Sequence, residues 1–280
     1  MLFRSVGALG STIARSLAAA GVGRFTLVDA DVMKPGNVIR HELRYPDVAR
    51  RKTTALRQVL LETNPFAQVE EIAGGSRQPD RALERQILDA NRRPTLVIAT
   101  TAVKAVEAQV DMLAARTGAD VPVLHAWVAA SAQLLRAFLY RPGRTPCTLC
   151  VECYRRATAT GRTSGYIADP VVPDTTFFEK SCAAPTHVGT GNSNALAAHV
   201  VVEMALLALA PGGLPDNEAH WLFAGNRMQK VAPGYPIAPL SRVTSCLAPH
   251  PECPLCAVGG MIQIVNSADG ALAGQNPEAA

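Results

Sequence analysis

The sequence has little of several features that would assign a protein class at once. Aromatic residues make up only 5% of the 280-residue chain, and a net charge of +4 is spread along it. A modest, dispersed charge is not typical of nucleic-acid binding, so we expect no nucleic-acid partner. No uninterrupted apolar run reaches the roughly 18 residues of a membrane-spanning helix, so we expect no membrane insertion.

An export signal is also missing from the sequence. The stretch before the first glycine, beginning Met1-Leu2-Phe3-Arg4, is too short for a signal peptide. We therefore expect a reducing, cytoplasmic compartment. In such a compartment the seven cysteines are better interpreted as metal ligands or reactive thiols than as disulfides.

Strand and helix patterns alternate through the first half of the chain. Short apolar runs predict strands at 1–6, 24–28, 68–72 and 95–99, and helical patterns lie between them at 11–20, 47–61, 80–90 and 104–116. This order predicts an α/β fold with a Rossmann-like, mostly parallel sheet and helices on both faces. The runs at 121–127 and 132–140 follow one another without a helix, so we expect antiparallel strands to extend the sheet.

A glycine turn near the start of the chain indicates a nucleotide site. Gly7-Ala8-Leu9-Gly10-Ser11 leads into the first helix, whose N-terminus favours a bound phosphate. Asp29 follows the second strand at nearly the spacing of a ribose-binding carboxylate. Ser5 takes the first position of the glycine fingerprint, however, so a tight turn without a ligand stays open as an alternative.

Two basic residues downstream favour a triphosphate over a dinucleotide. Arg40 and Lys52 follow Asp29 in the sequence. Arginine forks onto phosphate oxygens and lysine supplies a compact point charge, whereas a dehydrogenase needs neither at these positions. Each residue alone is more often a solvated surface charge, and only the ordered series points to phosphate.

These stretches, together with Asn37-Val38-Ile39-Arg40-His41, resemble the ThiF/MoeB family of ubiquitin-like-protein-activating enzymes, and bacterial ThiF-domain proteins most of all. The resemblance implies ATP and Mg²⁺ as cofactors and adenylation of the C-terminal glycine of a ubiquitin-like or sulfur-carrier protein. It also implies a homodimer. Relatives carry a helix before the first strand, so the chain resembles an N-terminally truncated member. The nucleotide site implied by the resemblance consists of Gly7, Gly10, Asp29, Asp31, Asn37, Arg40 and Lys52.

Two Cys-x-x-Cys pairs predict a structural zinc site. Four thiolates from Cys147, Cys150, Cys253 and Cys256 suit tetrahedral Zn²⁺, and a closed set of four ligands is structural rather than catalytic. Buried or redox-active thiols are the alternative, and Cys153 competes with Cys150 as a ligand. Relatives carry zinc on two such pairs.

Cys182 is the predicted reactive thiol. Lys180 lies two residues before it and would favour the thiolate. In the family a cysteine at this point can accept the activated carbonyl as a thioester, with Arg40 and Lys52 acting at the preceding adenylation step. His187 is a possible base for Cys182, and simple packing of Cys182 is the other interpretation. Cys246 is expected to be a buried small hydrophobe.

The domain interpretation follows from these motifs. We expect a nucleotide-binding part at 1–146 and, in the same domain, a part at 147–266 with the zinc knuckles, a crossover loop and a buried apolar helix at 194–210. The tail at 267–280 is expected to be disordered because its periodicity is lost.

One expected residue is missing from the pattern. Relatives place a magnesium-binding aspartate after the strand at 95–99, but this sequence reads Ala99-Thr100-Thr101-Ala102. Threonine hydroxyls are poor substitutes for carboxylate oxygens. The sequence therefore predicts an ATP-dependent activating enzyme for a Gly-Gly-ended partner. The alternatives are a catalytically impaired nucleotide- or partner-binding relative and, more remotely, a nicotinamide-dependent oxidoreductase.

Overall fold

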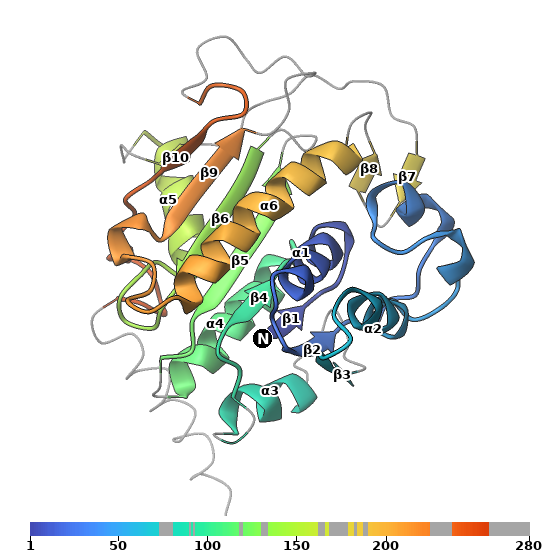
Figure 1. The fold of residues 1–280 in the computed structure, drawn as a ribbon. Helices are drawn as coiled ribbons and strands as arrows, with labels where there is room; N and C mark the ends of the chain where they lie inside the picture. The colour runs from blue at the N-terminus through green and yellow to red at the C-terminus, as the bar shows by residue number, and fades with distance from the viewer. Residues whose placement is uncertain are drawn as a thin grey trace, which may run out of the picture.

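A computed structural model describes residues 1–72, 81–89, 91, 93–117, 120–129, 134–161, 166–167, 179–181, 184–186, 190–224 and 237–257. Within these ranges one sheet of eight strands crosses the molecule in the order β10-β9-β6-β5-β4-β1-β2-β3 (Figure 1). The strands are β1 Leu2–Arg4, β2 Arg24–Val28, β3 Gln68–Ile72, β4 Val97–Ala99, β5 Val123–Ala129, β6 Leu134–Tyr140, β9 His220–Ala224 and β10 Arg242–Thr244.

Strands β1 to β5 run parallel to one another, whereas β6, β9 and β10 pair antiparallel with their neighbours. Strand β1 lies in the middle of the parallel part, where Leu2 pairs with Thr26 on one side and with Val97 on the other. The direction reverses between β5 and β6, which pair antiparallel along their whole length, and β9 and β10 continue the reversal. The predicted mostly parallel α/β sheet with antiparallel additions is therefore confirmed.

Helices cover both faces of the sheet (Figure 1). Side chains alternate along each strand, so Phe3, Phe25 and Leu27 pack toward α1, α2 and α6, whereas Leu2, Val28 and Val97 pack toward α3, α4 and α5. Each face thereby has its own apolar core. The helices are α1 Ala8–Ala19, α2 Lys52–Thr63, α3 Arg81–Leu88, α4 Lys104–Arg116, α5 Thr148–Ala159 and α6 Thr190–Leu209.

The start of α2 differs from the prediction. A helix was expected from 47, but the α-helix begins at Lys52 and is preceded by the short 3₁₀ helix η2, Tyr45–Asp47. Ala49 has a φ of 69°, which lies in the left-handed region and interrupts a right-handed helix. The chain then bends back, and an isolated bridge joins Val32 to Arg51. This bend places Lys52 beside the end of β2.

Helix α6 is the longest helix of the described residues and the most apolar. By length and composition alone, Gly191–Leu209 is long and apolar enough to cross a membrane. Here Ala198, Val201 and Met204 are buried in the core that α6 shares with α1 and the sheet. The predicted buried helix at 194–210 is present and begins four residues earlier. The tail at 267–280 lies outside the described residues.

Candidate nucleotide site and metal centre

The turn between β1 and α1 is built by three residues. Ser5 has a φ of 78°, a conformation that favours glycine, and Gly7 is the N-cap of α1. The Ser5 amide donates to the Val28 carbonyl at 2.9 Å, so the turn begins against the end of β2. Serine therefore occupies the first fingerprint position in the backbone conformation for which glycine is usually required.

The two glycines of the turn have different surroundings. A Cβ on Gly10 would lie 2.6 Å from the Ser5 carbonyl oxygen and 2.7 Å from the Thr100 Oγ1, so the helix, the turn and the loop after β4 meet there. A Cβ on Gly7 would meet only the Ser5 Oγ, at 3.8 Å. Gly10 is thus needed for packing, whereas the space beside Gly7 is open to a ligand at the helix N-terminus.

Asp29 lies directly after β2, and its carboxylate is held by backbone amides. Its Oδ2 accepts from the Val6 amide at 2.8 Å, and its Oδ1 accepts from the Asp31 amide at 2.8 Å. The residue is buried, with 6% of its surface exposed. A longer bond of 3.4 Å from Ser5 Oγ also reaches Oδ2. These bonds fix the carboxylate beside the glycine turn, and Oδ1 keeps a lone pair that could accept a ribose hydroxyl.

Lys52 pairs with Asp31, two residues after Asp29. Its ammonium donates to the Asp31 Oδ2 at 3.0 Å, and its side chain is only 6% exposed while that of Asp31 is 52% exposed. The Lys52 amide also donates to the Asp31 carbonyl at 3.0 Å. A buried ammonium beside an exposed carboxylate at the carboxyl end of β2 is placed where a bound phosphate could share its charge.

His41 connects the segment after β2, which carries Asn37 and Arg40, to the glycine turn. Its Nδ1 accepts from the Leu43 amide at 3.1 Å, so its Nε2 carries the proton and donates to the Val6 carbonyl at 2.9 Å. Burial is the main reason that the pKa of His41 falls to about 4, and the charges of Lys52 and Arg40 lower it further. The neutral ring has both nitrogens engaged by the protein, so it acts as an anchor.

The anchored segment carries Asn37 and Arg40. Both belong to the 3₁₀ helix η1, Pro35–Arg40, where Asn37 is buried and Arg40 is half-buried. A Cβ on Gly191 would lie 2.8 Å from the Ile39 carbonyl oxygen, so the start of α6 packs directly on η1. The structure thus gathers Asp29, Asp31 and Lys52 at one point and ties the segment with Asn37 and Arg40 to the same turn.

The four predicted cysteine ligands converge. The sulfur atoms of Cys147, Cys150, Cys253 and Cys256 all lie within 4.8 Å of one another, and all but Cys256 are fully buried. Cys147 Sγ lies 3.7 Å from Cys150 Sγ and 3.5 Å from Cys253 Sγ. A tetrahedral ion with bonds of about 2.3 Å to sulfur requires sulfur–sulfur distances of about 3.8 Å, so the residues fit a four-coordinate metal ion.

The cluster joins the start of α5 to the C-terminal segment. Cys147 is the N-cap of α5, and the His250 amide donates to the Cys150 sulfur at 3.3 Å, which stabilises a thiolate there. Cys153 lies one turn further along α5 and is not part of the group, so the choice of Cys150 over Cys153 agrees with the geometry.

The remaining cysteine predictions have mixed outcomes. Cys246 was expected to be buried but is exposed, because the strand β10 ends before it and its sulfur reaches only the Asn217 carbonyl at the surface. Cys182 and His187 lie outside the described residues. The strands on either side of Cys182, β7 Glu179–Ser181 and β8 Ala184–Thr186, pair antiparallel, and β7 lies against η1.

A family model described as the ThiF family matches residues 5–276 of the chain. The chain belongs to the ThiF family. One curated relative, the uncharacterized protein y4oA of Sinorhizobium fredii, is 26% identical over 220 residues. That alignment covers 73% of this chain and 35% of the relative, so the chain spans about a third of the relative's length.

Solved structures with the same fold include the E. coli enzyme MccB. MccB with ATP has a TM-score of 0.60 and 17% identity, covering 91% of this chain and 66% of MccB. The microcin C7 biosynthetic enzyme MccB with N-formylated MccA has a TM-score of 0.60 and 18% identity, with 91% and 67% covered. PaaA has a TM-score of 0.55 and 18% identity, with 80% and 68% covered.

The loop after β4 of this ThiF-family chain has no carboxylate of its own between Ala99 and Ala102. Thr100 Oγ1 donates to the Ser5 carbonyl at 3.1 Å, and Ala102 has a φ of 53°. Glu107, from the first turn of α4, reaches back so that its Oε1 accepts from the Ala102 amide at 3.0 Å and from Thr101 Oγ1 at 3.1 Å. Sequence reasoning missed Glu107, although an acid in the first turn of a predicted helix is a capping signal.

A buried ion pair supports the same region. His125 Nε2 and Asp111 Oδ1 are 2.6 Å apart, both side chains are fully buried, and Asp111 Oδ2 accepts from the Thr148 amide at 2.8 Å. Burial alone would lower the pKa of His125, but the charge and hydrogen bond of Asp111 raise it above its ordinary value. His125 thus lies in the core of the protein, and its partner Asp111 comes from α4.

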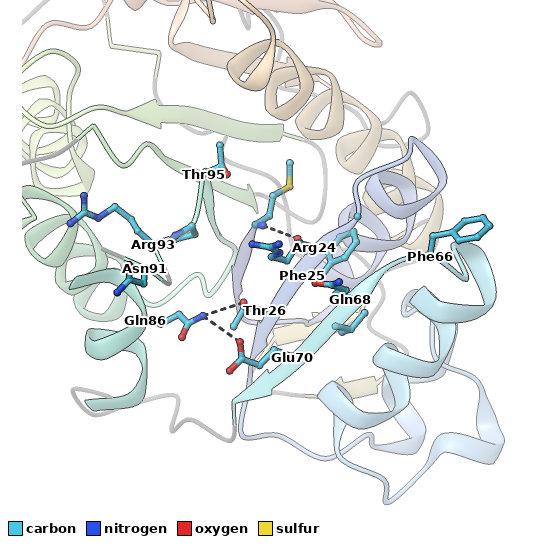
Figure 2. A pocket seen from close by; sticks show the side chains of 14 residues that line it. Arg24, Phe25, Thr26, Phe66, Gln68, Glu70, Gln86, Asn91, Arg93 and Thr95 are labelled. Carbon is cyan, nitrogen blue, oxygen red and sulfur yellow. Dashed lines mark hydrogen bonds between the residues drawn. The ribbon is translucent and has the colours of Figure 1, made fainter. Parts of the chain in front are cut away.

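A hollow lies at the opposite edge of the sheet, where the parallel strands begin (Figure 2). It has a volume of about 850 Å³ and includes Arg24, Gln68 and Thr95 in its lining. Gln86 spans its wall and donates to Glu70 Oε2 at 3.4 Å. Ligands of open parallel sheets bind at the carboxyl ends of the strands, so this hollow is not where a nucleotide is expected.

Proposed function

We propose that this ThiF-family chain binds ATP and activates the C-terminal carboxylate of a protein or peptide by adenylation. The observation that carries the proposal is the meeting of the open α1 N-terminus, the fixed Asp29 carboxylate and the buried Lys52 ammonium at the carboxyl ends of β1 and β2. This is the edge of a parallel sheet where nucleotides bind. The likeness in fold to MccB, which has been solved with ATP, is consistent with it.

In the proposed reaction a substrate carboxylate oxygen attacks the α-phosphorus of ATP. A new phosphorus–oxygen bond forms, the bond from the α-phosphorus to the bridging oxygen breaks, and pyrophosphate leaves with that electron pair. Asp29 would accept hydroxyl hydrogens of the ribose. Lys52 and Arg40 would balance the negative charge that moves onto the leaving pyrophosphate, with Asn37 donating to a phosphate oxygen.

The loop after β4 offers poor ligands for Mg²⁺, in contrast to the residues proposed to bind ATP. The loop from Ala99 to Ala102 offers hydroxyl groups but no carboxylate, and the nearby Glu107 Oε1 is already an acceptor of two hydrogen bonds. Mg²⁺ prefers carboxylate and phosphate oxygens. These residues do not form the expected magnesium site, and the proposed step uses the protein's own cations instead. A nucleotide-binding relative that does not turn over is therefore the second candidate function.

The proposal extends to the protein that is adenylated and to a transfer step after adenylation. The family resemblance favours a ubiquitin-like or sulfur-carrier protein with a C-terminal Gly-Gly, and a homodimer of this chain. If acyl transfer follows, the Cys182 thiolate would attack the adenylate carbonyl, a carbon–sulfur bond would form, and AMP would leave. We further infer that the cysteine cluster holds Zn²⁺ in a closed, structural site.

ATP binding and ATP–pyrophosphate exchange test the proposal separately. Calorimetric titration should detect ATP binding that Lys52→Ala weakens at least roughly tenfold, because a charge-assisted contact contributes about 1.5–3 kcal/mol. Arg57→Ala is the matched control, since Arg57 is an exposed cation on the same helix. Absence of ATP binding would overturn the proposal.

Exchange then distinguishes the two candidate functions. Label from pyrophosphate should enter ATP only when a carboxylate-bearing partner is added. Tight ATP binding without exchange for any candidate partner, combined with exchange gained by Ala102→Asp, would assign the chain to the impaired, nucleotide-binding class.

A further inference from the structure

The hollow at the amino ends of the parallel strands runs across the sheet (Figure 2). Its lining comes from the segment before β4 and from the starts of β1, β2 and β3, and these four strands are neighbours in the sheet. Neighbouring strands lie about 4.8 Å apart, so the hollow spans roughly 14 Å. A volume of about 850 Å³ over that length suits an extended peptide of about four or five residues.

Side chains of β2 and β3 form the floor of the hollow. Arg24 is paired with Gln68 in the register of these strands, and Thr26 is paired with Glu70. The two pairs are two residues apart along the strands, so their side chains point to the same face of the sheet. Gln86 of α3 donates to Thr26 Oγ1 at 3.5 Å and to Glu70 Oε2 at 3.4 Å. Helix α3 therefore covers the inner part of the floor, and Arg24 and Gln68 lie exposed beyond it.

Two arginines give the hollow positive charge that its own residues do not neutralise. Among the residues that the structure describes, neither the Arg24 nor the Arg93 side chain is paired with an acid, and the Arg93 Nε is buried without a hydrogen-bond partner. Glu70 supplies the carboxylate of the described lining, and it already accepts from Gln86. A buried donor without a partner is costly, so an anionic ligand that reaches Arg93 would gain a strong hydrogen bond.

Phe66 provides an apolar contact at the β3 end of the hollow. Its surface is 91% exposed, the largest fraction among the large hydrophobic residues of the described part of the chain. In Figure 2 Phe66 and Arg93 lie at opposite ends of the hollow, and Arg24 lies between them. A ligand that covers Phe66 and reaches both guanidinium groups therefore carries an apolar group and acidic groups along one extended chain.

The polar groups of the lining favour a peptide over a nucleic acid. The side-chain amides of Gln68 and Asn91 offer both donors and acceptors, which match the alternating polar groups of a peptide backbone. A nucleic acid carries one phosphate for each nucleotide, and the Glu70 carboxylate on the floor would repel a phosphate there. An acidic peptide can instead place its carboxylates at the two arginines only.

We propose that this hollow binds an extended acidic segment of a partner protein, with one carboxylate on Arg93, a second on Arg24 and an apolar side chain on Phe66. The site is separate from the glycine turn. Strand β2 has five residues, Arg24–Val28, so about 16 Å of extended chain separates Arg24 from Asp29. Binding at the hollow is therefore independent of ATP and of the proposed adenylation.

A labelled peptide tests the charge requirement. The probe is fluorescein-Glu-Gly-Gly-Glu-Leu with an amidated C-terminus, in which about 10 Å of extended chain separates the two glutamates, as two strand spacings separate β4 from β2. The amide cap removes the carboxylate that adenylation would require. In fluorescence anisotropy the probe should bind at least roughly tenfold more tightly than fluorescein-Gln-Gly-Gly-Gln-Leu, and added salt should weaken it. Equal binding of the two peptides, or binding of neither, would overturn the proposal.

Substitutions test each assigned contact. Arg93→Gln should weaken probe binding roughly tenfold, and Arg24→Gln at least roughly threefold, because the more exposed arginine is better screened by water. Phe66→Ala should weaken it roughly threefold through lost apolar contact. Arg24 and Phe66 are exposed, so these two variants keep the test valid if Arg93→Gln does not fold.

Arg144→Gln is the matched control, because it removes the same charge from an exposed arginine outside the lining. It should leave probe binding unchanged. An equal loss in Arg144→Gln and Arg24→Gln would mean that the probe senses only net charge, and it would overturn the proposal.

Competition separates this site from other anion sites. Saturating ATP should change the affinity of the probe by less than about twofold, because distant sites act independently. This result is expected whether or not the chain adenylates a partner, so a failure of the proposed function leaves it intact. Displacement of the probe by ATP would place it at the glycine turn and overturn the proposal. A short single-stranded RNA that binds more tightly than the probe and loses affinity in Arg24→Gln would overturn it in favour of a nucleic-acid site.

Discussion

The glycine turn and the cysteine cluster hold distant parts of the chain together by different means. At the turn, Asp29 and His41 bind backbone groups of Val6 directly, so protein–protein hydrogen bonds set the geometry. At the cluster, Cys147 and Cys253 are 106 residues apart, and their sulfur atoms lie 3.5 Å from each other. The turn is held by the protein's own hydrogen bonds, whereas in the cluster a metal ion of the kind proposed above would join the four thiolates by bonds.

Breaking the cluster should have the largest effect on stability. Cys253→Ser removes one of four ligands, and loss of a structural metal is among the few single changes that cost more than about 4 kcal/mol. For a chain of this size that corresponds to a fall in Tm of roughly 10 °C. Calorimetry and metal analysis check it, and bound zinc should fall from one equivalent toward none.

Cys246→Ser is the control for this change, because Cys246 is an exposed thiol outside the group. It should leave both Tm and zinc content unchanged. A Cys253→Ser protein with wild-type Tm would mean that the two segments are held by packing alone, and the contrast with the glycine turn would disappear.

Lowering the pH should reduce the stability of the protein, because protonation of His41 is less favourable in the folded turn than in the unfolded chain. Its pKa is about 4 when folded and about 6.5 when unfolded, so as pH falls the unfolded chain binds the proton first. The stabilisation is present above about pH 6.5 and is lost as pH falls toward 4, by about 3 kcal/mol. Urea unfolding at several pH values should therefore show wild type losing its advantage over His41→Gln across this window. A constant difference between the two proteins would contradict the neutral-anchor role.

Substitutions at the two glycines of the turn should have different effects. A change at Gly10 should lower stability, and a change at Gly7 should weaken ATP binding. Gly10→Ala forces a Cβ to 2.6 Å from the Ser5 carbonyl oxygen and should cost about 2 kcal/mol of stability. Gly7→Ala meets nothing closer than 3.8 Å and should keep Tm within a degree or two while weakening ATP binding about tenfold. Denaturation and ATP titration on both variants check this. Equal losses of stability would mean that Gly7 is a packing residue as well.

Local sequence signals were enough for strands β1 to β6, the turn and the cysteine set, but β9 and β10 were not predicted. Gly10, Asp29 and the two Cys-x-x-Cys pairs act through spacings that the chain fixes over short distances, and the parallel order of strands follows from the alternation of elements. The four thiols were placed correctly because a metal site constrains ligand type as well as spacing.

What the sequence could not supply were contacts between segments far apart in the chain. His41 reaches Val6, Asp111 reaches His125, and both roles depend on which surfaces the folded sheet brings together. The late start of α2 was missed because left-handed Ala49 carries no residue signal, since alanine is an ordinary helix former. Glu107 had a local signal, but a small cavity that it lines exists only after α4, α5 and β5 pack.

The smallest expected effect concerns Ser5 and sharpens the contrast between a turn built by hydrogen bonds and a cluster built by a metal. A left-handed non-glycine residue costs about 1–2 kcal/mol, while glycine adds about 0.5–1 kcal/mol of unfolded-state entropy. Ser5→Gly also gives up a long hydrogen bond of 3.4 Å from Ser5 Oγ to Asp29 Oδ2. The balance predicts that Ser5→Gly raises the free energy of unfolding, measured with urea, by about 0.5 kcal/mol. Ser16→Gly, inside helix α1, should lose about that much instead, because its backbone has no strain to relieve. If both variants lost stability alike, the positive φ at Ser5 would carry no strain, and the turn would tolerate serine at the fingerprint position without cost.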